Sequence, residues 1–139
     1  MCVRPLWLAV AATVVLLTTS ACSGTGDDDV ARVSRAFYQA VGAQDGAAAC
    51  RLLAPPTRAE VERSSGQPCA EGILDQGVQE ATGAPRVDVY GTMALVRWPQ
   101  ETTFVTRYDT GWQVYAAGCS PDPKSPPDAD RYDCDVQGG

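Results

Sequence analysis

The spacing of apolar residues changes twice along the chain. Residues 6–17 form an apolar run without a charge. After it, apolar residues recur at intervals of three and four, the period of a helix with one apolar face, at Val30, Val33, Phe37 and Val41. After Pro85 the interval becomes two, the period of a strand. The pattern predicts a leader segment, a helical first half and a sheet in the second half.

Four helices are expected in the first half. Gly42 ends the first, and Asp45 can cap a second over residues 47–53, which Pro55-Pro56 stops. Thr57 and Glu60 have the S/T-x-x-E spacing of a capping box, so a third helix should open at Thr57 and end at Gly66. Pro68 fits the first position of a fourth helix, because a helix needs no N–H donor there.

Four strands are expected after residue 85. They cover residues 86–90, 93–98, 102–108 and 112–117, where β-branched, aromatic or alternating residues are bounded by turn residues. Consecutive strands with short turns form an antiparallel meander, and the preceding helices would cover one of its faces. The predicted fold class is α+β, with N-terminal helices packed on a four-stranded antiparallel sheet.

The last part of the chain has a different character. Residues 120–131 are rich in Pro and Asp, which excludes both a helix and the interior of a strand. We interpret them as a loop, after which residues 131–136 alternate briefly and would return Cys134 to the side of Cys119. The predicted organisation is a signal peptide over residues 1–21, a flexible tether over 22–29 and one domain over 30–139.

The leader has the layout of a secretory signal. Arg4 precedes the apolar run, and the small residues Thr19-Ser20-Ala21 stand before Cys22. This ending resembles the lipobox of bacterial lipoproteins. The resemblance implies that Cys22 carries a diacylglyceryl group, that the signal is removed before it, and that the protein is anchored at the extracytoplasmic face of the cell membrane. An ordinary cleaved signal and an uncleaved anchor are the alternatives, since the charge-free stretch 5–22 reaches the lower end of the roughly 17–25 residues that span a bilayer.

Charge narrows the choice of partners. Removing residues 1–21 takes away Arg4 and no acid, which leaves ten basic and 17 acidic residues. Nucleic acids and anionic headgroups are bound by clustered Lys and Arg, so neither is an expected partner.

Four cysteines remain in the domain, namely Cys50, Cys69, Cys119 and Cys134. In an oxidising compartment four cysteines indicate two disulfides, with three possible connectivities. Their order along the chain favours Cys50–Cys69 and Cys119–Cys134, because each pair brackets one local unit. A metal site is the alternative, but the chain has no His and no CxxC motif.

The order of helices and strands resembles the NTF2-like (cystatin-like α+β) superfamily, and more narrowly the small lipoproteins of actinobacteria. The stretches that carry the resemblance are residues 37–40, 45–53, 68–71 and 112–119. The resemblance implies a helix–sheet cavity, which in some members of the superfamily holds catalytic acids, tyrosines or histidines. In this group of lipoproteins the domain is commonly of unknown function.

Candidate cavity residues come from both halves. Asp88 and Tyr90 share a strand face and could form a carboxylate–phenol pair, although Arg86 on that face makes a solvated surface the simpler interpretation. Phe37, Trp98 and Phe104 could line an apolar pocket or fill the core.

A calcium loop is suggested by Asp128, Asp130, Asp133 and Asp135, but the glycine and the terminal glutamate of an EF-hand are missing. We therefore expect no metal and no cofactor.

Two functions are compatible with these patterns. The first is a cell-envelope lipoprotein with a non-enzymatic binding domain, whose partner is an envelope protein or a small apolar ligand. The second is a small cavity enzyme of the isomerase or dehydratase type that uses Asp and Tyr. Because His, the usual base near neutral pH, is missing, the first is favoured.

Replacing Cys22 with Ala or Ser should release the protein from membranes or leave its precursor uncut. The reason is that stable attachment takes two or more acyl chains, whereas one chain binds only marginally. Fractionation and mass spectrometry of the mature N-terminus test this. A wild-type mature protein whose terminus is unmodified, or lies elsewhere than Cys22, would contradict the lipid anchor.

Overall fold

The computed structural model describes residues 25–122, 124 and 131–139. In this part of the chain, helices precede one antiparallel sheet with the strand order β1-β2-β3-β4-β5. The helical elements are α1 (Thr25–Gly42), α2 (Gly46–Leu52), α3 (Pro55–Ser65), α4 (Cys69–Gly72) and the 3₁₀ turn η1 (Ile73–Asp75). The strands are β1 (Arg86–Tyr90), β2 (Met93–Arg97), β3 (Thr102–Tyr108), β4 (Gly111–Pro121) and β5 (Tyr132–Gln137).

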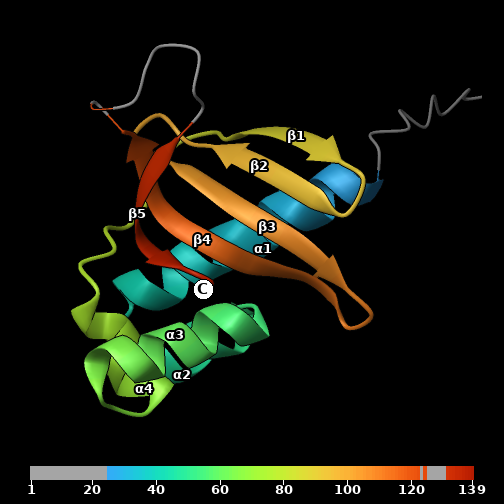
Figure 1. Ribbon diagram of the computed structural model, residues 1–139. Helices are drawn as coiled ribbons and strands as arrows, with labels where there is room; N and C mark the ends of the chain where they lie inside the picture. The colour runs from blue at the N-terminus through green and yellow to red at the C-terminus, as the bar shows by residue number, and fades with distance from the viewer. Residues whose placement is uncertain (1–24, 123, 125–130) are drawn as a thin grey trace, which may run out of the picture.

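Helix α1 crosses one face of the sheet, and α2, α3 and α4 gather near one end of it (Figure 1). Of the predicted apolar stripe of α1, Val30 and Phe37 are fully buried and Val41 nearly so, while Val33 is partly buried against the core. On the sheet, β2 alternates, with Ala94 and Val96 fully buried between half-buried neighbours. We call the side of the sheet that faces α1 the inner face and the opposite side the outer face.

The link between α2 and α3 completes the edge of β4. Strand β5 pairs with β4 only from Ala116 to Pro121, so the first half of β4 has no strand on that side. The Ala54 N–H donates to the Val114 carbonyl at 2.8 Å. The Gly138 N–H donates to the Tyr115 carbonyl at 3.0 Å. The α2–α3 link and the C-terminal segment after β5 thus each donate a backbone hydrogen bond to the part of β4 that β5 does not pair with.

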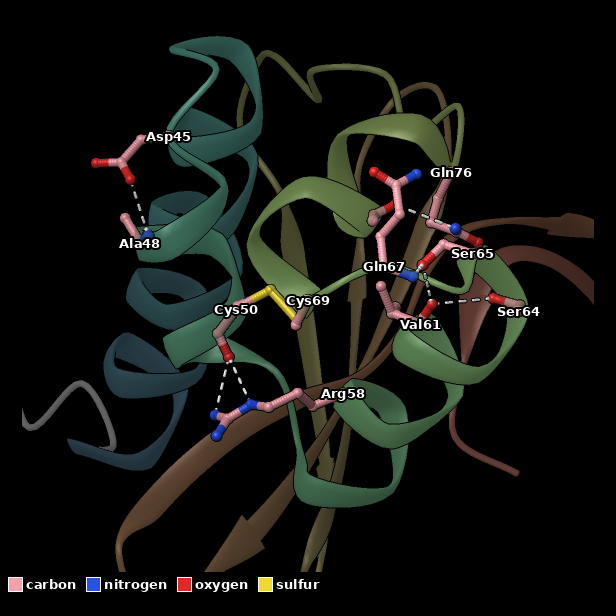
Figure 2. Close-up of a disulfide and its surroundings, with 11 residues drawn as sticks. Asp45, Ala48, Cys50, Arg58, Val61, Ser64, Ser65, Gln67, Cys69 and Gln76 are labelled. Carbon is pink, nitrogen blue, oxygen red and sulfur yellow. Dashed lines mark hydrogen bonds between the residues drawn. A yellow bond between two sulfur atoms is a disulfide. The ribbon is translucent and has the colours of Figure 1, made fainter.

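Both disulfides have the predicted connectivity. Cys50–Cys69 joins α2 to α4 with a Cα–Cα distance of 6.0 Å, and Cys119–Cys134 joins the paired strands β4 and β5. Near the first bridge, the Asp45 carboxylate accepts from the Ala48 N–H, so the predicted cap of α2 is confirmed (Figure 2). Arg58 donates to the Cys50 carbonyl from Nε and Nη2, at 3.1 and 2.9 Å, and so connects α3 to the bridge (Figure 2).

Two expectations about strands and the start of the domain are wrong. The sheet has five strands, because residues 132–137 pair with β4 and do not merely return beside Cys119. Helix α1 begins at Thr25, so residues 25–29 are helical and not part of a flexible tether. Acidic residues in its first turn, Asp27 and Asp28, interact favourably with the helix dipole and extend the helix beyond its apolar stripe.

The predicted capping box at Thr57 is also wrong. Helix α3 begins at Pro55 after Ala54, which has no side-chain cap, and proline is tolerated in a first turn. The Thr57 hydroxyl instead donates to the Tyr115 carbonyl of β4 at 2.7 Å, and Glu60 pairs with Arg63. The Thr57 hydroxyl thus bonds to the sheet and does not cap its own helix, as the local sequence pattern had predicted it would. Pro68 likewise precedes α4 as its N-cap residue and is not its first helical residue.

Replacing Cys50 and Cys69 together with Ser should lower the free energy of unfolding by about 3 kcal/mol, because the bridge closes a loop of 19 residues in the unfolded chain. Urea denaturation measures the change. Replacing Cys119 and Cys134 is the matched control and should cost a similar amount for a separation of 15 residues. Peptide mapping without reductant that linked Cys50 to Cys119 would contradict the observed pairing.

Candidate functional site

The space between α1 and the sheet is filled by side chains of the core. Phe37 and Tyr38 are fully buried on α1, and their rings meet edge to face at 5.3 Å between centroids. Tyr38 also meets Trp98 edge to face at 5.8 Å. Fully buried Val105 and Val114 of the inner face belong to the same cluster. Phe37 and Trp98, which could have lined a ligand pocket, are therefore parts of the hydrophobic core.

A chain of buried hydroxyl groups runs through this interface. Trp98 Nε1 donates to Ser34 Oγ at 3.1 Å, and Ser34 Oγ donates to Thr103 Oγ1 at 3.1 Å. The Tyr38 hydroxyl is hydrogen-bonded to Thr103 Oγ1 at 2.9 Å and accepts from the Gly118 N–H at 3.3 Å. These bonds connect α1 with the end of β2 and with β3 and β4. Their partners lie within the protein, so the hydroxyls hold the helix to the sheet.

Asp88 and Tyr90 do not lie in the helix–sheet interface. Val87, their neighbour on β1, packs against the core, and alternate residues of a strand point to opposite faces. Asp88 therefore lies on the outer face, where it forms an ion pair with Arg97 of β2. Tyr90 is 61 % exposed. The placement expected from the cavity hypothesis is wrong for both residues, and Arg86 had already favoured a solvated face.

Phe104 also lies on the outer face, where its ring meets that of Tyr132 edge to face at 5.0 Å. A hollow of about 210 Å³ opens beside this pair. We call it the outer-face hollow, and its lining includes Met93, Phe104, Tyr115 and Tyr132. Phe104 thus lines a hollow of mixed polarity on the outer face, and not the space between helix and sheet.

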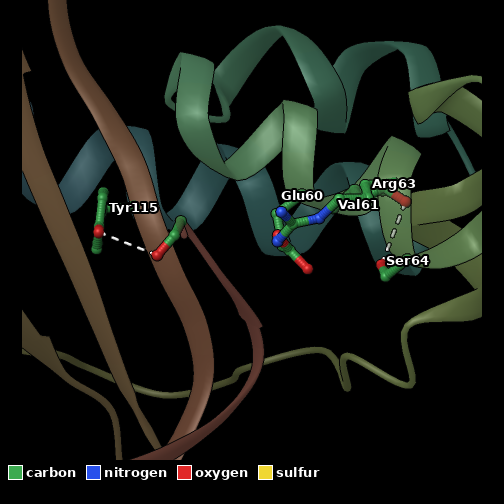
Figure 3. A network of polar contacts seen from close by, with 6 residues as sticks. Glu60, Val61, Arg63, Ser64 and Tyr115 are labelled. Atoms are coloured by element: carbon green, nitrogen blue, oxygen red, sulfur yellow. Dashed lines mark hydrogen bonds and ion pairs between the residues drawn. The ribbon is translucent and has the colours of Figure 1, made fainter.

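A polar hollow of about 440 Å³ lies between α3 and β5. The polar side chains that α3 contributes are engaged within that helix: Arg63 pairs with Glu60, and Ser64 Oγ donates to the Val61 carbonyl at 3.3 Å (Figure 3). Asp135 and Gln137 line the hollow from β5.

Glu101 is the acid with the most perturbed environment. Burial raises the pKa of Glu101 from 4.5 to about 7; the Gly118 N–H counteracts the shift and the charge of Asp135 adds to it. One carboxyl oxygen, Oε1, is buried without a hydrogen-bond partner. Desolvation and the charge of Asp133 raise the pKa of Asp135 as well. Two acids with raised pKa values therefore lie near one point of β4.

The conformation of Gly118 brings these acids together. Its φ of +66° lies in the left-handed region although the residue is inside β4, and a Cβ at this position would collide with the Asp135 carboxylate. The register between β3 and β4 shifts on either side of Phe104, which is the irregularity of a β-bulge. Glu101 has no site signal in the sequence, because Pro99-Gln100-Glu101 has the composition of a turn. The one available signal is Gly118, directly after the predicted strand 112–117, because a glycine within a strand can mark a bulge or a close approach of another chain segment.

Metal binding and membrane crossing find no support in the described residues. Nowhere in this part of the chain do three or more Cys, Asp or Glu side chains gather as a metal site requires. None of its helices has the length and apolar character that crossing a membrane requires. Asp133 and Asp135 of the suggested calcium loop lie on β5, while Asp128, Asp130 and Cys22, the predicted lipidation site, lie outside the described residues.

No family model, curated protein or solved structure matches this chain. What the molecule itself establishes is an α+β domain with helices on a five-stranded antiparallel sheet and two disulfides.

The free energy of unfolding should fall as the pH rises from about 4.5 to about 7. In this range the folded protein retains the Glu101 proton that the unfolded chain releases, so the stabilisation is complete below 4.5 and is lost as the pH passes the folded pKa. Asp135, whose pKa is also raised, contributes in the same direction. Urea denaturation at pH 5, 6, 7 and 8 measures the slope.

Glu101→Gln should flatten that slope and make the protein more stable than wild type at pH 8, because no buried charge then forms. Glu62→Gln removes the same group from an exposed position on α3 and is the control. An unchanged slope in Glu101→Gln would show that this carboxyl does not titrate as its burial requires.

Proposed function

We propose that the protein is an exported, lipid-anchored binding domain of the NTF2-like type, without catalytic activity, and that a protein partner binds its outer sheet face. The observation that carries the proposal is the contrast between the two faces. The inner face is filled by α1, whereas Met93, Leu95, Phe104 and Tyr132 remain half-buried on the outer face.

The composition of the outer face suits a protein interface. Aromatic and methionine side chains are enriched in the centres of such interfaces, and Met93, Phe104, Tyr115 and Tyr132 surround the outer-face hollow. Tyr90, which lies on the edge strand β1 and is 61 % exposed, extends this surface to the edge of the sheet. With a volume of about 210 Å³, the hollow can receive one side chain of a partner, such as the anchor residues on which interface affinity commonly depends.

Two observations support attachment to the outside of the membrane. The two disulfides indicate an extracytoplasmic location, because disulfides persist where the environment is oxidising. The leader with Cys22 at its end supplies the anchor in this proposal. The resemblance to the NTF2-like superfamily is compatible with the five-stranded meander and remains part of the proposal.

A small enzyme of the isomerase or dehydratase type is the alternative, and one observation favours it. Glu101 has a pKa of about 7, which suits a general acid or base, and the Gly118 N–H near it is bound to the Tyr38 hydroxyl. Such an enzyme would use Glu101 with Tyr38, in place of Asp88 with Tyr90. Against it, Tyr38 is fully buried in the core and its hydroxyl is already bonded.

Photo-crosslinking in intact membranes tests the proposed interface. A crosslinking amino acid at Leu95 should join the protein to one discrete partner, because the side chain at this position lies on the outer face. The same amino acid at Arg51, an exposed residue of α2, is the matched control and should give no such product. Phe104→Lys should reduce the Leu95 product at least tenfold, since it places a charge in the centre of the surface.

Two results would contradict the binding proposal. One is the same crosslinked product from Leu95 and from Arg51. The other is loss of the cellular role in a folded, correctly anchored Glu101→Gln protein that keeps its Leu95 crosslink, which would favour the enzyme.

A further inference from the structure

Two arginines stand directly opposite each other at the start of β1 and the end of β2. In the antiparallel register, Arg86 pairs with Arg97. Side chains at such positions have Cβ atoms about 4.5–5.5 Å apart, and like charges there destabilise a sheet. The pair is unexpected in a chain with a net charge of −6, which has only 11 basic residues with which to compensate 17 acids.

The acids of the protein neutralise only one of the two. Asp88 forms its ion pair with Arg97 and lies two residues from Arg86 on the same face of β1. Across residues 25–122 and 131–139, no carboxylate forms an ion pair with Arg86, whose side chain is exposed. The local balance of Arg86, Arg97 and Asp88 is therefore one positive charge.

Both arginines line a hollow of about 370 Å³. We call it the arginine hollow, and the rest of its lining is apolar or aromatic, from Ala84, Pro85, Trp98 and Pro99. Trp98 is anchored by its bond to Ser34 and is only 6 % exposed. The two prolines restrict the backbone on either side of the arginine pair, so the walls are held in place before any ligand arrives.

The turn before β1 adds to this rigidity. Gly83 has a φ of +96°, and a Cβ there would lie 3.1 Å from Cγ of Pro99. The segment leading into β1 is thus in close contact with the segment leaving β2. A third guanidinium, that of Arg35 on α1, lies 5.9 Å from the Trp98 ring centroid and adds positive charge next to the hollow.

We propose that the arginine hollow binds the carboxylate of a small organic acid with an apolar body. The carboxylate accepts hydrogen bonds from Arg86 and Arg97, since a guanidinium fork matches the two oxygens of a carboxylate. A monoanion neutralises the one positive charge left among Arg86, Arg97 and Asp88 and reduces the repulsion between the two arginines. The apolar body of the ligand lies against Pro85, Pro99 and the accessible edge of Trp98.

This site is separate from the outer-face hollow, whose lining shares no residue with it. The inference therefore does not rest on the proposed protein partner, and either can fail without the other.

Titration with benzoate at constant ionic strength, followed by ¹H–¹⁵N NMR of the disulfide-bonded domain, tests the inference. Benzoate should produce saturable shifts confined to residues 83–86 and 97–99, with a dissociation constant on the order of 1 mM, as for a ligand with few atoms. Inorganic phosphate should bind more weakly, because it has no apolar body to lie against the prolines and Trp98.

Three variants test whether benzoate binds through the arginine hollow. Arg86→Gln should weaken benzoate binding about tenfold, the usual size of one lost charge-assisted bond. Arg51→Gln removes the same charge from α2 and should leave binding unchanged. Asp88→Asn frees Arg97 from its ion pair and should tighten binding several-fold, an effect that damage to the fold would not produce.

Shifts that fail to saturate, or benzoate affinities that are equal in wild type and Arg86→Gln, would overturn the site. Tighter binding of phosphate than of benzoate would overturn its assignment to a carboxylate.

Discussion

The packing of α1 across the inner face of the sheet determines which side of every strand is buried. Phe37 and Tyr38 occupy the interface, and the hydroxyl chain through Ser34 and Thr103 fixes the helix against β3. Because strand side chains alternate, this one contact sends Val87 inward and Asp88 outward. It also uses the volume in which a helix–sheet cavity would lie. A ligand therefore does not fit between α1 and the inner face, and the hollows formed by the described residues lie elsewhere, on the outer face, at the ends of β1 and β2 and beside α3.

Strand β4 connects the part of the sheet under α1 with the other helices and with β5. Its first half accepts backbone hydrogen bonds from Ala54 and Gly138, and its second half pairs with β5. The bulge near Gly118 lies beyond this change of partner and brings Asp135 and Glu101 toward the end of the hydroxyl chain. The pKa of Glu101 is raised there because the charged carboxylate would be poorly solvated. The perturbed pKa of Glu101 is thus explained by the way the strands meet, without any need for a catalytic role.

The parts of the fold that depend on local patterns could be predicted from the sequence. The stripe of α1, the cap at Asp45 and the limits of β1 and β3 follow from spacing and turn residues, and the order of the cysteines favoured the observed disulfides. The predictions that failed concern residues whose hydrogen-bond partners lie far away in the sequence. Thr57 donates to β4 and does not cap its own helix, and β5 is a strand only because β4 extends far enough to pair with it.

The candidate sites were harder to predict for the same reason. Spacing showed that Asp88 and Tyr90 share a face, but a period of two does not reveal which face of a strand meets the helix. The repulsive pair Arg86–Arg97 exists only through the register of β1 with β2, which joins residues eleven positions apart. Glu101 has no local signal except its proximity to a turn, and its environment is created by Gly118 and Asp135, which lie on other strands.

Net charge is a poor guide to what such a domain binds. At physiological ionic strength, charges more than about 8 Å apart are largely screened, so an excess of acids spread over the surface does not cancel a local pair of arginines. What counts at the arginine hollow is the balance among Arg86, Arg97 and Asp88, which is opposite in sign to that of the whole chain. The acidic excess disfavours nucleic acid, which requires many cations along one surface. It does not disfavour a single carboxylate, which two guanidinium groups can bind.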